Sequence, residues 1–130
     1  MEQGLITAVA MNGAGIIHDF ELALMGHTSE EVDDEIDEGR FGMAEETGRI
    51  LNDAISRGHR NGQGMGEAVG HYINRAKGQF PHRGTSILAT GAKLSIPVTI
   101  HVAVGTDIIT CIRQPTVRRS ARHRSWIFDA

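Results

Sequence analysis

Apolar and polar positions along the chain predict a strand near each end of residues 1–109, with helices between them. The apolar run at residues 5–10 is typical of a buried parallel strand, expected over Thr7–Met11. A second run predicts a strand over Pro97–Val104, stopped by Gly105. Strands separated by helical segments indicate a parallel sheet, so we expect an α/β fold.

The segments between these strands carry apolar residues at helical spacing, with glycines and helix-capping residues at their ends. We expect Gly26 to end the first helix, a break at Phe41-Gly42, and Thr85 or Ser86 to cap the last helix. The helices are expected near residues 17–26, 29–38, 43–57, 66–76 and 85–94.

The first strand runs into a turn of small residues, Asn12, Gly13, Ala14 and Gly15. The backbone of such a turn can approach a ligand closely. A helix that begins there directs N–H groups and its positive dipole end toward the turn, which suits phosphate. Nucleotide-binding folds use this geometry at the carboxyl end of a strand. Because N-G-A-G is not the G-x-G-x-x-G fingerprint, an ordinary strand-to-helix turn is the alternative.

Three further polar residues lie on or near these elements. Asp107 follows the second strand, so we expect it at the same sheet edge as Asn12–Gly15. Its carboxylate could accept hydrogen bonds from a ribose or bind an amine, whereas the alternative is a helix N-cap by Asp107 or Thr106. His18, one turn into the first helix, would contact a ligand or lie at the surface. His101 is expected in the core or at a sheet edge rather than in catalysis.

Composition excludes several classes of function. The net charge of −3 argues against a nucleic-acid partner. No apolar run reaches the roughly 18 residues of a membrane span, and no basic leader precedes Leu5. The lone cysteine, Cys111, fits a reducing compartment, so we expect a cytoplasmic protein. The acidic run Glu30–Glu38 indicates a solvated helix face, the alternative being a divalent metal site. It lacks an EF-hand spacing, and the histidines lack a zinc spacing, so we expect no metal site.

Three separated motifs carry a family resemblance: LITAVAMNGAGIIHDFE, FGMAEETG and IPVTIHVAVGTDII. In this order they resemble the deoxyhypusine synthase family, most closely its bacterial deoxyhypusine-synthase-like branch. The resemblance implies a partial Rossmann-like, NAD-binding domain over residues 1–109, with a parallel sheet flanked by helices. It implies that Asn12, Gly13, Ala14 and Gly15 form the NAD loop and that Asp107 belongs to the cofactor and polyamine region.

The same resemblance implies an activity. The family oxidises spermidine with NAD and transfers its aminobutyl group, through an imine on an enzyme lysine, to an acceptor amine. That acceptor is a protein lysine or another polyamine, and the enzymes are homo-oligomers. Ile17 and His18 stand where the eukaryotic enzymes carry acidic residues, which implies that a substrate contact at His18 differs.

The family's catalytic lysine follows Trp-Gly, and no lysine of this sequence has that context: Ile127 follows Trp126, and neither Lys77 nor Lys93 matches. Family members are also longer and carry a segment before the first strand. We therefore expect a truncated relative without a catalytic residue, inactive as written and prone to association through an open sheet edge. The alternatives are a non-catalytic nucleotide-binding fragment and the non-functional product of a broken gene.

Residues 110–130 differ in character from the rest of the chain. They hold five arginines and one aspartate, net +4, whereas residues 1–109 hold 8 basic and 15 acidic residues, net −7. After GTDII the family continues HMHPxADGAAIG and then SxxDFR. Codons read one base earlier allow HMHP at residues 110–113 and ADGAA at 115–119, and Trp126-Ile127 force the later aspartate. We therefore predict that residues 110–130 are an out-of-frame, poorly ordered tail, with a divergent tail as the alternative.

Overall fold

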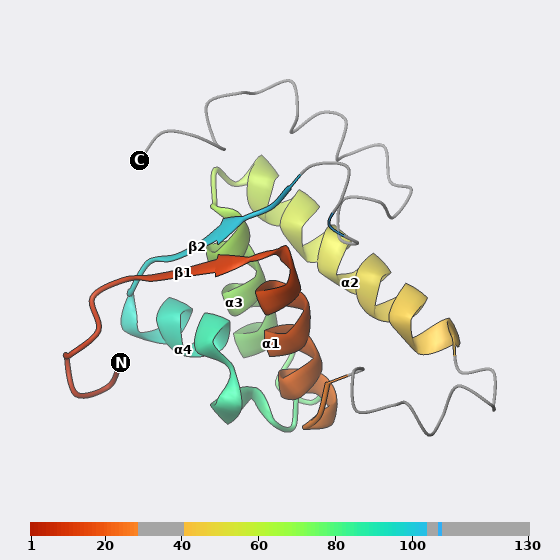
Figure 1. Ribbon diagram of the computed structural model, residues 1–130, viewed down its shortest axis with the longest axis horizontal. Coiled ribbons are helices and arrows are strands. Elements are labelled where there is room, and N and C mark those ends of the chain that lie inside the picture. Colours follow the sequence, from red (N-terminus) through yellow and green to blue (C-terminus); the bar gives the residue numbers. More distant parts are fainter. Residues whose placement is uncertain (29–40, 104–106, 108–130) are drawn as a thin grey trace.

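The computed structural model describes residues 1–28, 41–103 and 107 (Figure 1). This part of the chain combines helices with a two-stranded parallel sheet, so the expected mixture of helix and parallel strand is confirmed. The expected acidic helix at 29–38 and the tail at 110–130 lie outside the described residues. The elements in chain order are β1 (Val9–Asn12), α1 (Gly13–Met25), α2 (Phe41–Arg60), α3 (Met65–Arg75), the 3-10 turn η3 (Arg83–Thr85), α4 (Ile87–Leu94) and β2 (Val98–His101).

The sheet is covered on one face only within the described residues. β1 and β2 pair in parallel, with Val9 opposite Val98 and Asn12 opposite His101. Side chains alternate between a face that packs on the helices and a face that is exposed. The exposed positions are Ala10, Asn12, Thr99 and His101. The continuous apolar run predicted a buried parallel strand. That expectation was wrong for the outer face, because α1, α3 and α4 contact the opposite one (Figure 1).

The strands are shorter than predicted. β1 starts at Val9 rather than Thr7, and β2 ends at His101 rather than near Val104, which itself lies outside the described residues. The Val9 N–H donates to the carbonyl of Pro97 at 3.0 Å. Pro97 itself has no N–H to donate, so this residue limits the ladder at the amino end of the pair.

Two helices begin earlier than predicted. α1 starts at Gly13, so Gly13, Ala14 and Gly15 form its first turn rather than a loop. The helix begins here because the Asn12 side chain caps it: its Oδ1 accepts the Gly15 N–H at 2.8 Å. α2 starts at Phe41, where a break was expected. The predicted end of α1 is confirmed, since Gly26 closes the helix with a positive φ of 85°.

The remaining helices lie close to their predicted positions. α3 spans Met65–Arg75 against an expected 66–76. α4 starts after Ser86, whose Oγ accepts the Ala89 N–H at 2.9 Å, so Ser86 is the cap among the two candidates. Thr85, which was expected in this helix, instead ends the 3-10 turn η3 that precedes it.

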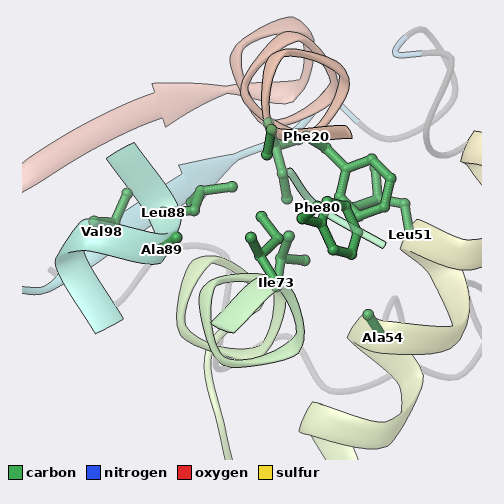
Figure 2. Close-up of a cluster of buried hydrophobic side chains, with 11 residues drawn as sticks. Phe20, Leu51, Ala54, Ile73, Phe80, Leu88, Ala89 and Val98 are labelled. Atoms are coloured by element: carbon green, nitrogen blue, oxygen red, sulfur yellow. The ribbon is translucent and has the colours of Figure 1, made fainter. Parts of the chain in front are cut away.

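The core lies between the sheet and the helices, with α3 at its centre (Figure 2). Phe80 packs edge-on against Phe20 at 5.1 Å between ring centroids and against Tyr72 at 5.9 Å. Gly70 of α3 has no room for a side chain: a Cβ there would lie 2.8 Å from the carbonyl carbon of Leu88. The close contact of α3 with α4 therefore depends on glycine at this position.

Candidate functional site

Parallel pairing places the carboxyl ends of both strands at the same edge of the sheet, and Asp107 lies there against Gly13. A Cβ built on Gly13 would overlap the Asp107 carboxylate, with Cγ only 2.7 Å away. The expectation that these two segments meet at one sheet edge is confirmed. Gly13 therefore has no space for a side chain, and a carboxylate faces the first turn of α1.

The Asp107 carboxylate is held by the backbone that follows β2. Its Oδ2 accepts the Ala103 N–H at 2.9 Å, and the Asp107 N–H donates to the Ala103 carbonyl at 3.1 Å. These two hydrogen bonds with Ala103 hold the carboxylate beside α1. The alternative that Asp107 or Thr106 caps a following helix concerns residues outside the described part of the chain.

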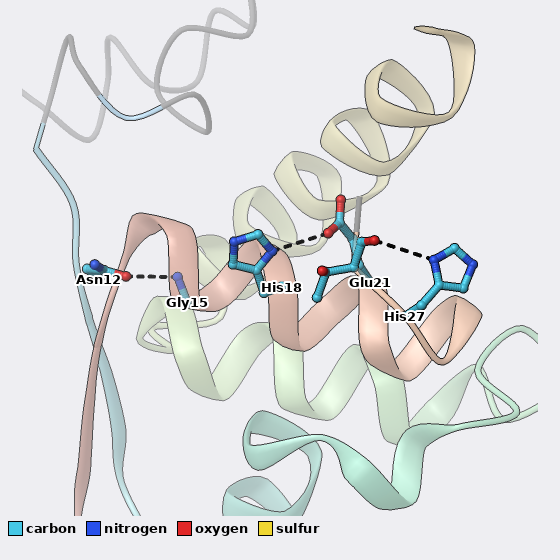
Figure 3. A network of polar contacts seen from close by, with 6 residues as sticks. Asn12, Gly15, His18, Glu21 and His27 are labelled. Atoms are coloured by element: carbon cyan, nitrogen blue, oxygen red, sulfur yellow. Dashed lines mark hydrogen bonds and ion pairs between the residues drawn. The ribbon is translucent and has the colours of Figure 1, made fainter. Parts of the chain in front are cut away.

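Polar contacts follow one another at every third position from the start of α1, each between neighbouring turns of the helix (Figure 3). The row begins with the Asn12 cap on Gly15 and continues with His18, whose Nδ1 lies 3.4 Å from Oε2 of Glu21. The His18 side chain is 29% exposed and that of Glu21 only 4%. His18 thus lies one turn beyond the candidate site, as expected, and contacts a buried carboxylate that sequence reasoning missed.

His101 is a neighbour of the site that the sequence did not assign to it. It pairs in register with Asn12, its side chain is exposed, and its Nε2 lies 3.0 Å from the Thr99 hydroxyl. It therefore lies at a sheet edge, one of the two positions expected, and not in the core. The alternation V-T-I-H could have shown that His101 and Thr99 share a face opposite to Val98 and Ile100.

A buried aspartate connects α1 to α4. Asp19 is 4% exposed, and its Oδ2 accepts the Ser86 hydroxyl at 2.6 Å and the Leu88 N–H at 3.2 Å, while Oδ1 accepts the Ile87 N–H at 2.6 Å. Burial raises the pKa of Asp19, and these hydrogen bonds oppose that rise. Because its partners lie 67 to 69 residues away, no local motif indicated this role.

Comparison of the chain with protein-family models, curated proteins and solved structures finds no match. Within the described ranges, no three His, Cys, Asp or Glu side chains are placed to hold a metal ion. None of the described helices is long and apolar enough to cross a membrane. The candidate site is thus defined by its own geometry, and NAD binding by Asn12–Gly15 and Asp107 stays a prediction.

Proposed function

We propose that this chain is a nucleotide-binding α/β unit related to the deoxyhypusine synthase family, with NAD bound at the start of α1. One observation carries the proposal: the Asp107 carboxylate lies against Gly13 at the carboxyl ends of two parallel strands. Dinucleotide-binding folds place a glycine-containing helix start and an acidic side chain at this edge. The resemblance of the motifs around both residues to one family supports the same conclusion.

The residues of this edge fit NAD if its pyrophosphate and its ribose contact different groups of the protein. The start of α1 suits the pyrophosphate, since backbone N–H groups and the helix dipole favour an anion there. Asp107 already fills the space beside Gly13, and two anions repel each other at short range. We therefore assign the pyrophosphate to the side of the exposed Ala14 and the ribose hydroxyls to Asp107.

The chain offers no lysine for imine chemistry beside this site. Its two lysines are Lys77 and Lys93, and both are exposed. Lys93 lies in the last turn of α4, which leads into the amino end of β2, whereas Asp107 follows the carboxyl end. Transfer through an imine needs an amine nucleophile within reach of the substrate. We therefore propose binding without group transfer for this chain.

NAD binding tests the proposal directly. Titration of the 15N-labelled chain with NAD should shift the amide signals of Gly13, Ala14 and Gly15. Asp107→Ala should weaken NAD about tenfold, the loss expected for a hydrogen bond to a charged group. Gly13→Ala should weaken it further, because the added Cβ displaces that carboxylate.

Asp53→Ala, at an exposed position of α2, is the matched control and should leave NAD affinity unchanged. Equal affinities of the wild-type chain and Asp107→Ala would contradict the role of Asp107. Amide signals that do not move at millimolar NAD would contradict the proposed function as a whole.

We expect no aminobutyl transfer by the chain as written. Incubation with NAD and spermidine should produce NADH absorbance and diaminopropane only at background, since no lysine lies at the site. Turnover above background would refute this prediction.

Expression of the gene with the frame restored after Ile109 is the companion experiment. A restored chain that binds neither NAD nor spermidine would contradict the proposed relation to the family.

A further inference from the structure

Asn12 and His101 are neighbours on the exposed face of the sheet, at the edge where the candidate site lies. They are register partners on β1 and β2, and both side chains are exposed. Partners on adjacent parallel strands direct their side chains to the same face, and such strands lie about 5 Å apart. Because α1, α3 and α4 contact the opposite face, the pair lies on the side of the sheet that these helices leave open.

The cap on α1 uses only one atom of the Asn12 side-chain amide. Its Oδ1 accepts the Gly15 N–H at 2.8 Å, and the amide nitrogen cannot take that place because it is a donor only. Nδ2 is therefore directed away from α1, as Figure 3 shows. Its two N–H groups have no acceptor within the described part of the chain. Asn12 thus presents a hydrogen-bond donor beside the first turn of α1.

The ring of His101 is likewise engaged at one atom. Its Nε2 lies 3.0 Å from Thr99 Oγ1, and this hydroxyl donates to the Val9 carbonyl at 3.5 Å. Because a hydroxyl has one proton, a hydroxyl that donates to the carbonyl accepts the Nε2–H of the neutral histidine. Nδ1 then carries the lone pair and, among the described residues, has no donor in contact with it. His101 thus presents a hydrogen-bond acceptor next to the donor of Asn12.

We propose that Asn12 and His101 together bind the base of the nucleotide, through an amino group and the acceptor atom beside it. Asn12 Nδ2 donates to that acceptor, and His101 Nδ1 accepts an N–H of the amino group. Adenine presents such a pair at its amino edge, where asparagine is a common partner, and the carboxamide of nicotinamide presents the same pair. This inference rests on the proposed function, because it places a base beside the phosphate and ribose contacts assigned above.

Two dinucleotides that each differ from NAD at one base test this contact in the full chain. Nicotinamide hypoxanthine dinucleotide has an oxygen in place of the adenine amino group, and acetylpyridine adenine dinucleotide has a methyl group in place of the carboxamide nitrogen. One of the two should bind the wild-type chain about fivefold more weakly than NAD, the loss expected for one neutral hydrogen bond. That analogue identifies the base that the pair binds. Equal affinities for all three dinucleotides would overturn the proposal.

Substitutions at the pair should remove this preference. His101→Phe keeps a flat ring without the acceptor, so it should bind NAD about fivefold more weakly and no longer distinguish NAD from the analogue. Asn12→Ser keeps a good helix cap but loses the amide donors, and should also weaken NAD about fivefold. His59→Phe, at an exposed position in the last turn of α2, is the matched control and should change neither affinity nor preference. A His101→Phe variant with the wild-type preference would contradict the role of His101.

NMR of the 15N-labelled wild-type chain separates the base contact from the proposed function. It is measured at about pH 8, where histidines of ordinary pKa near 6.5 are neutral. On addition of NAD, the Asn12 side-chain amide signals and the His101 Nδ1 signal should move together with the backbone amides of Gly13–Gly15. Backbone shifts without a shift at either side chain would overturn the base contact and leave the proposed function intact.

If none of these signals moves at millimolar NAD, the base contact and the proposed function both fail. The analogue series and the NMR titration use the wild-type chain, so they decide the proposal even where a variant does not fold. Circular dichroism of each variant shows whether its loss of affinity reflects the contact or the fold.

Discussion

Replacement of Phe80 with alanine should lower the free energy of unfolding by about 4 kcal/mol. Phe80 is fully buried and makes edge-to-face contacts with Phe20 of α1 and Tyr72 of α3. The substitution removes the buried aromatic surface and leaves a cavity between two helices that cannot fully close. Urea denaturation followed by far-ultraviolet circular dichroism measures the loss.

Ile87→Ala is the control for this substitution, because Ile87 is 40% exposed at the start of α4 and should cost less than about 1 kcal/mol. Phe80→Leu retains part of the buried volume and should lose roughly half as much as Phe80→Ala. It keeps the comparison measurable if the alanine variant does not fold. A loss below about 1.5 kcal/mol for Phe80→Ala would show that this side chain is not at the centre of the core.

Replacement of Asp19 with alanine should lower the free energy of unfolding by about 3 kcal/mol at neutral pH. The substitution leaves the Ser86 hydroxyl and the N–H groups of Ile87 and Leu88 without their acceptor in a buried place. It therefore weakens the start of α4 and its connection to α1 together. Asp53→Ala, at an exposed position, should change stability by less than about 0.5 kcal/mol. Equal effects of the two substitutions would contradict the anchoring role of Asp19.

The pH dependence of stability shows whether burial or hydrogen bonding has the larger effect on the pKa of Asp19. Burial raises its pKa in the folded protein above the ordinary 3.8, so the folded state binds the proton more tightly than the unfolded chain. The stability that this proton contributes is fully present below 3.8 and is lost as the pH rises through the raised pKa. Because asparagine does not titrate, the stability of the wild-type chain relative to Asp19→Asn should be greatest near pH 3 and fall toward pH 7. The opposite trend would mean that hydrogen bonding to the carboxylate outweighs its burial.

The candidate site illustrates what local pattern can and cannot predict. The meeting of Gly13 and Asp107 was predictable, because two apolar strands joined through helices pair in parallel and so share a carboxyl edge. The form of the turn was not, since the Asn12 side chain caps Gly15 and draws the small residues into the helix. The Asp19 connection was not predictable either. It depends on Ser86, almost 70 residues away, and nothing in the residues around either one indicates the other.

The sequence by itself determined the order of helices and strands, the parallel sheet and the sheet edge where the candidate site lies. These features follow from hydrophobic period, glycine and capping residues, which act over a few neighbours along the chain. Tertiary structure decided which sheet face is covered, where the strands end and which polar groups are buried. Glu21 illustrates the difference, since a carboxylate next to Phe20 gives no sign in the sequence that its side chain is only 4% exposed. Burial and long-range pairing depend on what packs against a residue, and that is set by the whole described fold rather than by its neighbours in sequence.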